Sequence, residues 1–407
     1  LFRLYYRFDM GAWNNKLLSY AAGYLQFLGT DKYSAEDISK QFYNLACNFT
    51  INTGNEETTV IISGLQENFD KAVALFEDLI HNCKPDEAAL AGLKNRVLKT
   101  RANNKLNKTA ISQGLRSYAS YGPQNPFNFV LTDDEVKNMK AEDLTNLLHS
   151  LMSYNHKVLY YGPKPLPALT ASLQKLHTMP SSFIANDQGV KFKRTMQTRN
   201  EVLFADYDAV QAEIYWVKNL SVYDPKEEAL INMFNGYFGG GMGSIVFQTI
   251  RESKALAYST FAQVQTPLKK DDTYSIVAYV GSQADKMNEA IAGMNELLDD
   301  LPKADANFIN ARKSLMKDIE TDRITKDAII TSYLNAVKKG VDRDLRKDNY
   351  AQYSSLTLND LYKYHQDVLA KKPYTYCVVA SEKKINVDDL KKYGEVKKLS
   401  LPEIFGY

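Results

Sequence analysis

The chain has 407 residues, which is too long for one compact core and indicates about two domains. Its 50 lysines and arginines nearly balance 48 acidic residues, and the net charge of +2 gives no reason to expect nucleic acid or an anionic membrane as partner. No apolar run of about 18 residues occurs, so the sequence predicts no transmembrane segment.

The start of the chain bears on its compartment. It begins at Leu1, inside an expected strand, and no signal peptide is visible, so we interpret it as a processed or cut fragment. The compartment stays open. The bacterial periplasm or another exported compartment would follow if a signal peptide had been removed upstream.

Residues 55–80 show a strand–turn–helix pattern. A β-rich run with a polar start leads through a short turn into an amphipathic helix, whose apolar positions are Ala72, Leu75, Phe76 and Leu79. A Pro-containing turn at 84–85 and a long charged helix over 86–103 follow. Helices around 132–152 and an apolar strand at 156–162 complete this half of the chain.

The second half repeats the pattern. Residues 271–298 again read as strand, turn and helix, with Ala290, Gly293, Met294 and Leu297 at the matching positions. A helix over 304–321, helices within 326–369 and a strand at 374–380 follow. Residues 178–198 are polar, basic and aperiodic, which is typical of a linker.

These patterns predict an α+β fold built by tandem duplication of two homologous domains. We expect the first domain over 1–177 and the second over 199–407, joined by the linker at 178–198. Each domain should be a mostly antiparallel sheet with helices packed on one face.

A glycine run lies in the second domain. Gly239, Gly240 and Gly241 follow a helical segment, and Arg251 and Tyr258 stand seven positions apart beyond them. A dinucleotide-binding loop needs the order strand, glycines, helix, so the preceding helix argues against nucleotide binding. A guanidinium and a phenol near a flexible loop could instead grip a peptide carbonyl. A helix-ending turn without a ligand remains the alternative.

No complete catalytic apparatus accompanies this pair. The five histidines form no H-x-x-E-H, H-E-x-x-H or i, i+4 pair, and the sequence has no G-x-S-x-G elbow and no Walker A loop. The three cysteines, Cys47, Cys83 and Cys377, are far apart and read as buried structural thiols.

The segment 234–258 resembles the signature of the insulinase/pitrilysin family of zinc peptidases. That signature reads L-N-x-x-L-G-G-G-M-x-S-x-L-F-x-x-I-R-E-x-x-G-L-A-Y, and this chain reads FNGYFGGGMGSIVFQTIRESKALAY. One departure is Ala255 at the usual glycine, which we expect to stiffen the turn before Tyr258. The resemblance covers nearly the whole chain as two consecutive family domains.

The resemblance also locates a lost metal motif. Residues 16–30 match the helix that carries H-x-x-E-H in the catalytic half of the family, and here Tyr20 and Tyr24 replace the histidines while Gly23 replaces the glutamate. The region of the third, acidic ligand is 96–101, where the sequence reads RVLKTR. The first domain is therefore degenerate, and we expect no cofactor in this chain and zinc in a partner half.

In the family's two-part enzymes, the zinc-free half closes over the zinc-bearing half and contributes an Arg and a Tyr that hold the substrate backbone. The resemblance implies this role for Arg251 and Tyr258, with the glycines as loop contacts. We therefore expect the non-metal half of a zinc metallopeptidase, inactive alone, whose partners are an H-x-x-E-H half, joined or separate, and a peptide. The alternatives are a catalytically dead assembly or scaffold subunit and a free-standing peptide-binding module.

Overall fold

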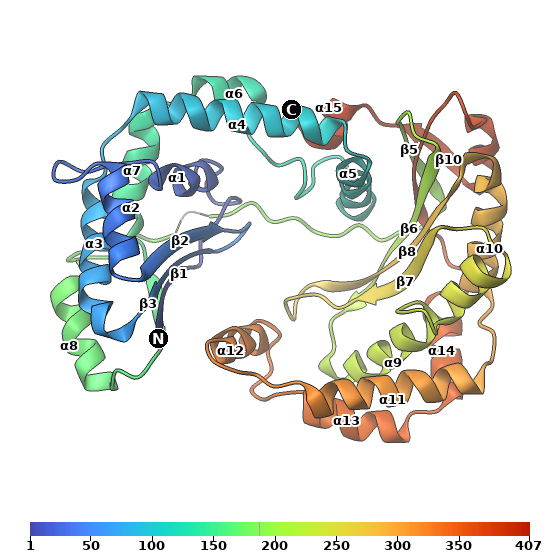
Figure 1. Cartoon of the computed structure of the whole chain (residues 1–407). Coiled ribbons are helices and arrows are strands. Elements are labelled where there is room, and N and C mark those ends of the chain that lie inside the picture. Colours follow the sequence, from blue (N-terminus) through green and yellow to red (C-terminus); the bar gives the residue numbers. More distant parts are fainter. Residues whose placement is uncertain (187) are drawn as a thin grey trace. The chain divides into compact units, whose positions relative to one another are not determined.

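The computed structural model describes residues 1–186 and 188–407. These residues form two compact units (Figure 1). Unit 1 contains residues 1–103, 129–191 and Tyr407, and unit 2 contains residues 104–128 and 192–406. The segment 104–128 thus belongs to unit 2, although it lies between two stretches of unit 1 in the chain.

Unit 1 is built on a four-stranded antiparallel sheet of order β2-β3-β1-β4. Its strands are β1 (Phe2–Phe8), β2 (Cys47–Thr53), β3 (Thr58–Gly64) and β4 (His156–Tyr161). Its helices are α1 (Leu18–Leu25), α2 (Ala35–Asn44), α3 (Phe69–Asn82), α4 (Glu87–Lys105), α6 (Asp133–Asn138), α7 (Ala141–Leu151) and α8 (Leu166–Leu176).

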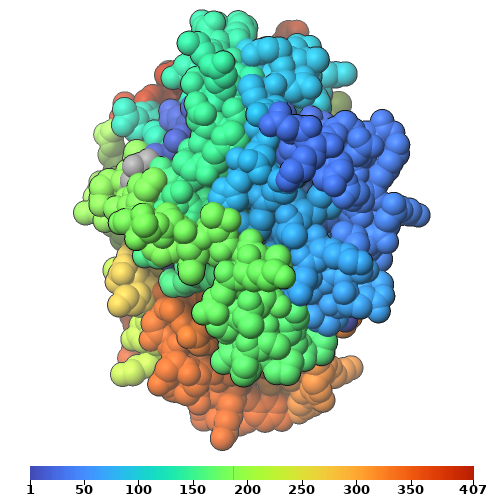
Figure 2. All heavy atoms as spheres, turned by 90° about the vertical axis from the view of Figure 1, so that its left-hand side faces the viewer, coloured from blue at the N-terminus to red at the C-terminus, as the bar shows by residue number. Residues whose placement is uncertain are grey.

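The core of unit 1 lies between this sheet and its helices. Leu4 and Tyr6 of β1 and Ile62 of β3 are fully buried together with Phe76 of α3. Because side chains alternate along a strand, these residues share one face of the sheet. On the outside of the unit, α3 and α8 lie side by side (Figure 2).

Unit 2 contains a six-stranded sheet of order β10-β5-β9-β6-β8-β7. The β10–β5 and β5–β9 pairs are parallel and the other pairs antiparallel, so the sheet is mixed. Its strands are β5 (Glu201–Asp206), β6 (Gln211–Val222), β7 (Ser259–Gln265), β8 (Thr273–Gln283), β9 (Thr375–Ala380) and β10 (Glu395–Lys398).

Helices surround this sheet. The described ones are α5 (Lys108–Tyr121), α9 (Glu228–Phe238), a π-helix (Phe247–Ser253), α10 (Met287–Asp299), α11 (Asp305–Thr321), α12 (Ala328–Lys338), α13 (Arg346–Ser355), α14 (Leu358–Val368) and α15 (Leu401–Phe405). Ile214 and Trp216 of β6 point into the main core. Tyr215 points to the opposite face, where Arg116 of α5 lies over its ring at 4.7 Å. The second face is therefore covered by α5.

The expected α+β class is confirmed. The expected helices and strands around 55–103 and 271–321 match β3, α3, α4, β8, α10 and α11 closely. Four strands of each unit also share one arrangement. In unit 1, β1 to β4 pair in the order β2-β3-β1-β4, and in unit 2, β6 to β9 pair in the corresponding order β7-β8-β6-β9. A tandem duplication would produce this order, and it stays a prediction. Among the described residues, no helix has the length and apolar character to cross a membrane.

Candidate functional site

The glycine run joins the end of α9 to the edge strand β7. α9 ends at Gly239, and a Cβ placed there would lie 2.2 Å from the backbone oxygen of Ala262 in β7. Asn235 reinforces the junction, since its side chain donates to the carbonyl of Val264 (2.9 Å) and accepts from the Val264 amide (2.8 Å). Gly239 is thus required by packing, and the outer backbone groups of Val264 are not available to a further strand.

The rest of the glycine loop is open. A Cβ on Gly241 would meet nothing within 4 Å, and Met242 is 75% exposed. Two side chains hold the loop backbone: the Ser244 hydroxyl donates to the Gly241 carbonyl (2.6 Å), and the Gln248 amide donates to the Met242 carbonyl (2.6 Å). Gly240 has less space around it than Gly241, because a Cβ there would lie 2.7 Å from the Asn235 carbonyl oxygen.

Arg251 projects from the π-helix that follows the loop. The preceding residue, Ile250, is fully buried and anchors this short helix. The Arg251 guanidinium lies 4.9 Å from the Phe247 ring centroid, and its Nε is 3.8 Å from a Glu252 carboxylate oxygen. The described residues give this side chain no hydrogen bond, and 45% of it is exposed. Its N–H donors are therefore available to a ligand.

Tyr258 lies directly before β7. Its backbone amide donates to the Gly281 carbonyl (2.9 Å), which ties it to β8, while its side chain remains exposed. The hydroxyl oxygen accepts a hydrogen bond from the Gln283 amide (2.7 Å). Since that bond uses an oxygen lone pair, the hydroxyl hydrogen remains free to donate. Gln283 had no signal in the sequence, because its role depends on the pairing of β7 with β8.

The turn between Arg251 and Tyr258 is strained at Ala255. This residue has φ of 48°, the left-handed region that disfavours a side chain. The turn is closed by the Leu256 amide, which donates to the Ile250 carbonyl (2.9 Å). No hydrogen bond or ring contact joins Arg251 to Tyr258 within the described residues, so the structure places both on one short exposed segment without linking them.

The helix that matches the family's zinc motif is α1 of unit 1. Tyr24 is fully buried, and its hydroxyl donates to the Asp86 carbonyl (2.6 Å) and accepts from the Asp86 amide (2.8 Å). Tyr20 accepts a hydrogen bond from Arg101 (3.1 Å). A Cβ on Gly23 would meet nothing within 4 Å. The two tyrosines thus serve as anchors between α1 and the helix that follows Asp86.

Arg101 lies in the α4 region where the acidic metal ligand is expected. It is 6% exposed and donates to the Asp133 carboxylate (2.6 Å), to the Leu131 carbonyl (2.6 Å) and to Tyr20. Its guanidinium lies 4.3 Å from the Tyr407 ring centroid. Burial raises the pKa of Tyr20, although Arg101 acts in the opposite direction. A neutral phenol and a fixed cation are a poor environment for Zn²⁺, which prefers thiolate, imidazole and carboxylate ligands.

These residues do not fit a catalytic zinc ion. Across residues 1–186 and 188–407, no group of three or more His, Cys, Asp or Glu side chains could hold a metal. The contact between Tyr20 of α1 and Arg101 of α4 instead joins the two segments from which the family draws its ligands.

Comparison with known proteins places these features in a family. Residues 13–128 match the model described as "Insulinase (Peptidase family M16)", and residues 173–315 match the model described as "Peptidase M16 inactive domain". The "Uncharacterized zinc protease YmxG" of Bacillus subtilis is 22% identical over 288 residues, covering 70% of this chain and 68% of that protein.

Two further similarities concern proteins described as inactive. The "Non-peptidase homolog YmxG" of Helicobacter pylori is 18% identical over 369 residues, covering 88% of this chain and 82% of that protein. The solved M16 inactive domain from Pseudomonas fluorescens has a TM-score of 0.71 at 15% identity, covering 93% of this chain and 92% of that chain. At this identity the structural likeness shows the fold alone.

Proposed function

The chain belongs to the insulinase family, peptidase family M16, and on this premise we propose that it is the zinc-free half of a two-part metallopeptidase. In this proposal a second half with an intact H-x-x-E-H motif, joined to this chain or separate, holds the zinc ion. This half closes over it and positions the peptide. The substrates are peptides that are small or unfolded enough to enter an enclosed chamber.

The observation that carries the proposal is the free donor capacity of Arg251 and Tyr258. Both side chains are exposed, and each keeps N–H or O–H donors that no described residue uses. A guanidinium and a phenol can donate to a peptide carbonyl and to the negative charge that develops on its oxygen during hydrolysis. The buried Ile250 fixes the π-helix that carries Arg251, and the backbone bond to Gly281 of β8 fixes Tyr258. Both backbones are therefore in place before a substrate binds, which lowers the entropy cost of binding.

The loop glycines have different parts in this proposal. Gly239 holds the end of α9 against β7, whereas Gly241 has open space on its outer side. We propose that the open part of the loop lies along the bound peptide, where a backbone without side chains permits close approach.

A fluorogenic-peptide assay tests the proposal. The chain alone should cleave no peptide. Mixing it with a family subunit that carries H-x-x-E-H should give peptidase activity that a chelator abolishes. Arg251→Ala and Tyr258→Phe should each lower kcat by about 10- to 1,000-fold, as expected for a single transition-state donor. Lys313→Gln on α11 is the control, since it removes an exposed cation that contacts neither Arg251 nor Tyr258.

The second candidate is a catalytically dead assembly subunit. The tyrosines at the expected histidine positions, Tyr20 and Tyr24, favour it, because their hydrogen bonds to Arg101 and to the Asp86 backbone stabilise unit 1 rather than leave a vacant site. Absence of peptide cleavage in a complex shown to contain the zinc-bearing partner would support this candidate. Unchanged kcat in both Arg251 and Tyr258 variants of an active complex would remove the pair from catalysis.

A further inference from the structure

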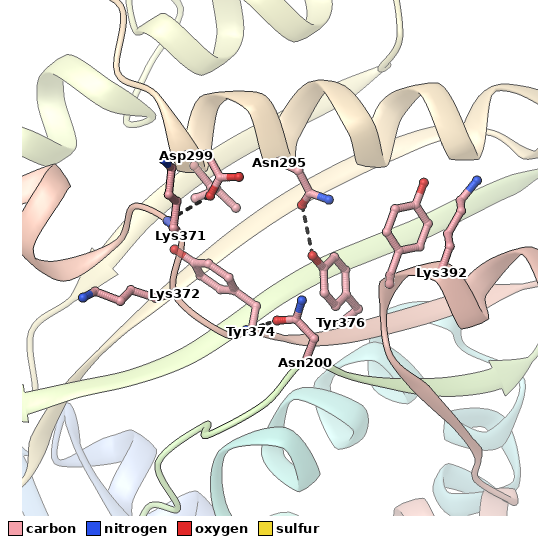
Figure 3. A pocket seen from close by; sticks show the side chains of 10 residues that line it. Asn200, Asn295, Asp299, Lys371, Lys372, Tyr374, Tyr376 and Lys392 are labelled. Carbon is pink, nitrogen blue, oxygen red and sulfur yellow. Dashed lines mark hydrogen bonds between the residues drawn. The ribbon is translucent and has the colours of Figure 1, made fainter.

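Unit 2 contains a pocket of about 270 Å³ between the end of α10 and the start of β9, away from the glycine run (Figure 3). Its volume is just below the range typical of small-molecule sites. The lining residues are Asn200, Asn295, Leu298, Asp299, Lys371, Lys372, Tyr374, Tyr376, Lys392 and Tyr393. Three lysines face a single aspartate, so the charge of the lining is +2.

Two amide side chains in this pocket have fixed orientations. The Asn295 oxygen accepts from the Trp216 indole N–H (2.7 Å) and from the Tyr376 hydroxyl (3.2 Å). The Asn200 oxygen accepts from the Tyr374 amide (2.9 Å). Because the oxygens are engaged, the NH₂ groups must face elsewhere, and the described residues provide no acceptor for either. The pocket therefore presents hydrogen-bond donors.

The three lysines flank the pocket wall that Tyr374 and Tyr376 form. Figure 3 shows Lys371 and Lys372 on one side of Tyr374 and Tyr376, and Lys392 on the other. The described residues form no ion pair with any of the three. Asp299 accepts a hydrogen bond from the backbone amide of Lys371 (2.9 Å), which occupies part of its carboxylate. The positive charge of the pocket is thus largely uncompensated.

A fourth lysine lies buried beside this wall. Lys218 of β6 is 7% exposed, and no described residue gives it a hydrogen bond or ion pair. It lies two residues beyond Trp216, which pairs with Tyr376, so it is on the face of the sheet that lines the pocket. Burial, and then the charge of Lys372, lower the pKa of Lys218. A buried ammonium without a counter-charge is costly, and an anion bound nearby would relieve that cost.

We propose that this pocket binds a small organic phosphate. The lysines would act as point charges on the phosphate, as lysines commonly do. A phosphate dianion also matches the charge of the lining. Tyr393 is partly exposed and stacks on the buried Tyr376 with ring centroids 5.7 Å apart, so the organic part of the ligand would pack beside the Tyr393 ring. This binding is independent of the peptidase role proposed above.

Trp216 is a built-in reporter of binding, because its indole bonds to Asn295 of the pocket. The chain has two tryptophans, so a Trp13→Phe background isolates the Trp216 fluorescence. Phenyl phosphate should change it saturably, while phenol and succinate at equal ionic strength should not. Lys371→Gln and Lys372→Gln should each raise the Kd for phenyl phosphate at least fivefold. Lys313→Gln, on the exposed surface of α11, should leave the Kd unchanged.

A second variant separates loss of binding from loss of folding. Lys218→Met should raise the melting temperature of the free protein, because it removes a buried unpaired charge. It should also reduce the further rise in melting temperature that phenyl phosphate causes. A change in fluorescence that is linear in phosphate, or equal in the lysine variants and the control, would overturn the proposal. Equal binding of succinate would overturn the assignment to phosphate.

Discussion

The buried hydrogen bonds of Arg101, in the region where the family's acidic ligand is expected, lead to a testable prediction about stability. Arg101→Met keeps most of the buried volume but removes the donors to Asp133, Leu131 and Tyr20. Loss of a donor to the buried Leu131 carbonyl costs about 1–3 kcal/mol. The Asp133 side chain is 38% exposed and can return to water, so we count only about 1 kcal/mol for that ion pair.

Together with the Tyr20 hydrogen bond, these losses should lower the free energy of unfolding of unit 1 by about 3–4 kcal/mol. The control is Arg96→Met on the same helix, where the guanidinium is exposed and lies 4.5 Å from the Phe27 ring centroid. Loss of that contact should cost no more than about 1 kcal/mol.

Urea unfolding followed by tryptophan fluorescence measures both variants. Trp13 lies in unit 1 and Trp216 in unit 2, so a Trp216→Phe background reports unit 1 alone. The Arg101 variant should shift the midpoint to lower urea with an unchanged slope. Equal shifts for Arg101→Met and Arg96→Met would refute the idea that the buried hydrogen bonds of Arg101 link α1 to α4.

Three further predictions concern unit 2. Ala255→Gly should stabilise the protein by up to about 1 kcal/mol in thermal unfolding, since it relieves a φ of 48°, whereas Ala257→Gly should destabilise it. Gly239→Ala should lower the melting temperature strongly through its clash with β7, while Gly241→Ala should leave it unchanged; equal effects would show that the loop can adjust. Burial lowers the pKa of His365, so the unfolded chain takes up the proton first, and stability should fall as the pH drops below about 6.5. A His365→Gln variant should show a shallower fall in melting temperature between pH 7 and pH 5, and an identical pH profile would contradict this assignment.

Local patterns predicted much of the fold. The apolar spacing around Phe76 and Met294 correctly indicated α3 and α10, because the period of a helix is visible within a few turns of sequence. The glycine run correctly marked the end of α9 at Gly239. The association of α5 with the sheet of unit 2 was not visible, because it depends on contacts such as Arg116 with Tyr215, which are far apart in the chain.

The candidate site was predictable in type but not in detail. Arg251 and Tyr258 were found from a motif, and the structure adds that both are exposed; their role remains a proposal. The motif marked Ala255 as a departure, and its left-handed backbone explains why glycine is preferred there. The hydrogen bond from Gln283 to Tyr258 and the lysine pocket depend on tertiary placement, which spacing in one sequence does not reveal.

The position of α5 has a consequence for any attempt to divide the chain. A protease that cuts once within 178–198 would produce two fragments, yet the N-terminal fragment would still carry α5, whose Lys108 bonds to Glu213 at 2.5 Å and whose Ser120 carbonyl accepts from the Asn219 side-chain amide at 2.9 Å. The nicked protein should therefore stay together as a non-covalent complex of fragments. Expressing residues 192–407 alone would expose the sheet face that α5 covers, so a fragment meant to fold as unit 2 has to carry residues 104–128 as well as 192–406.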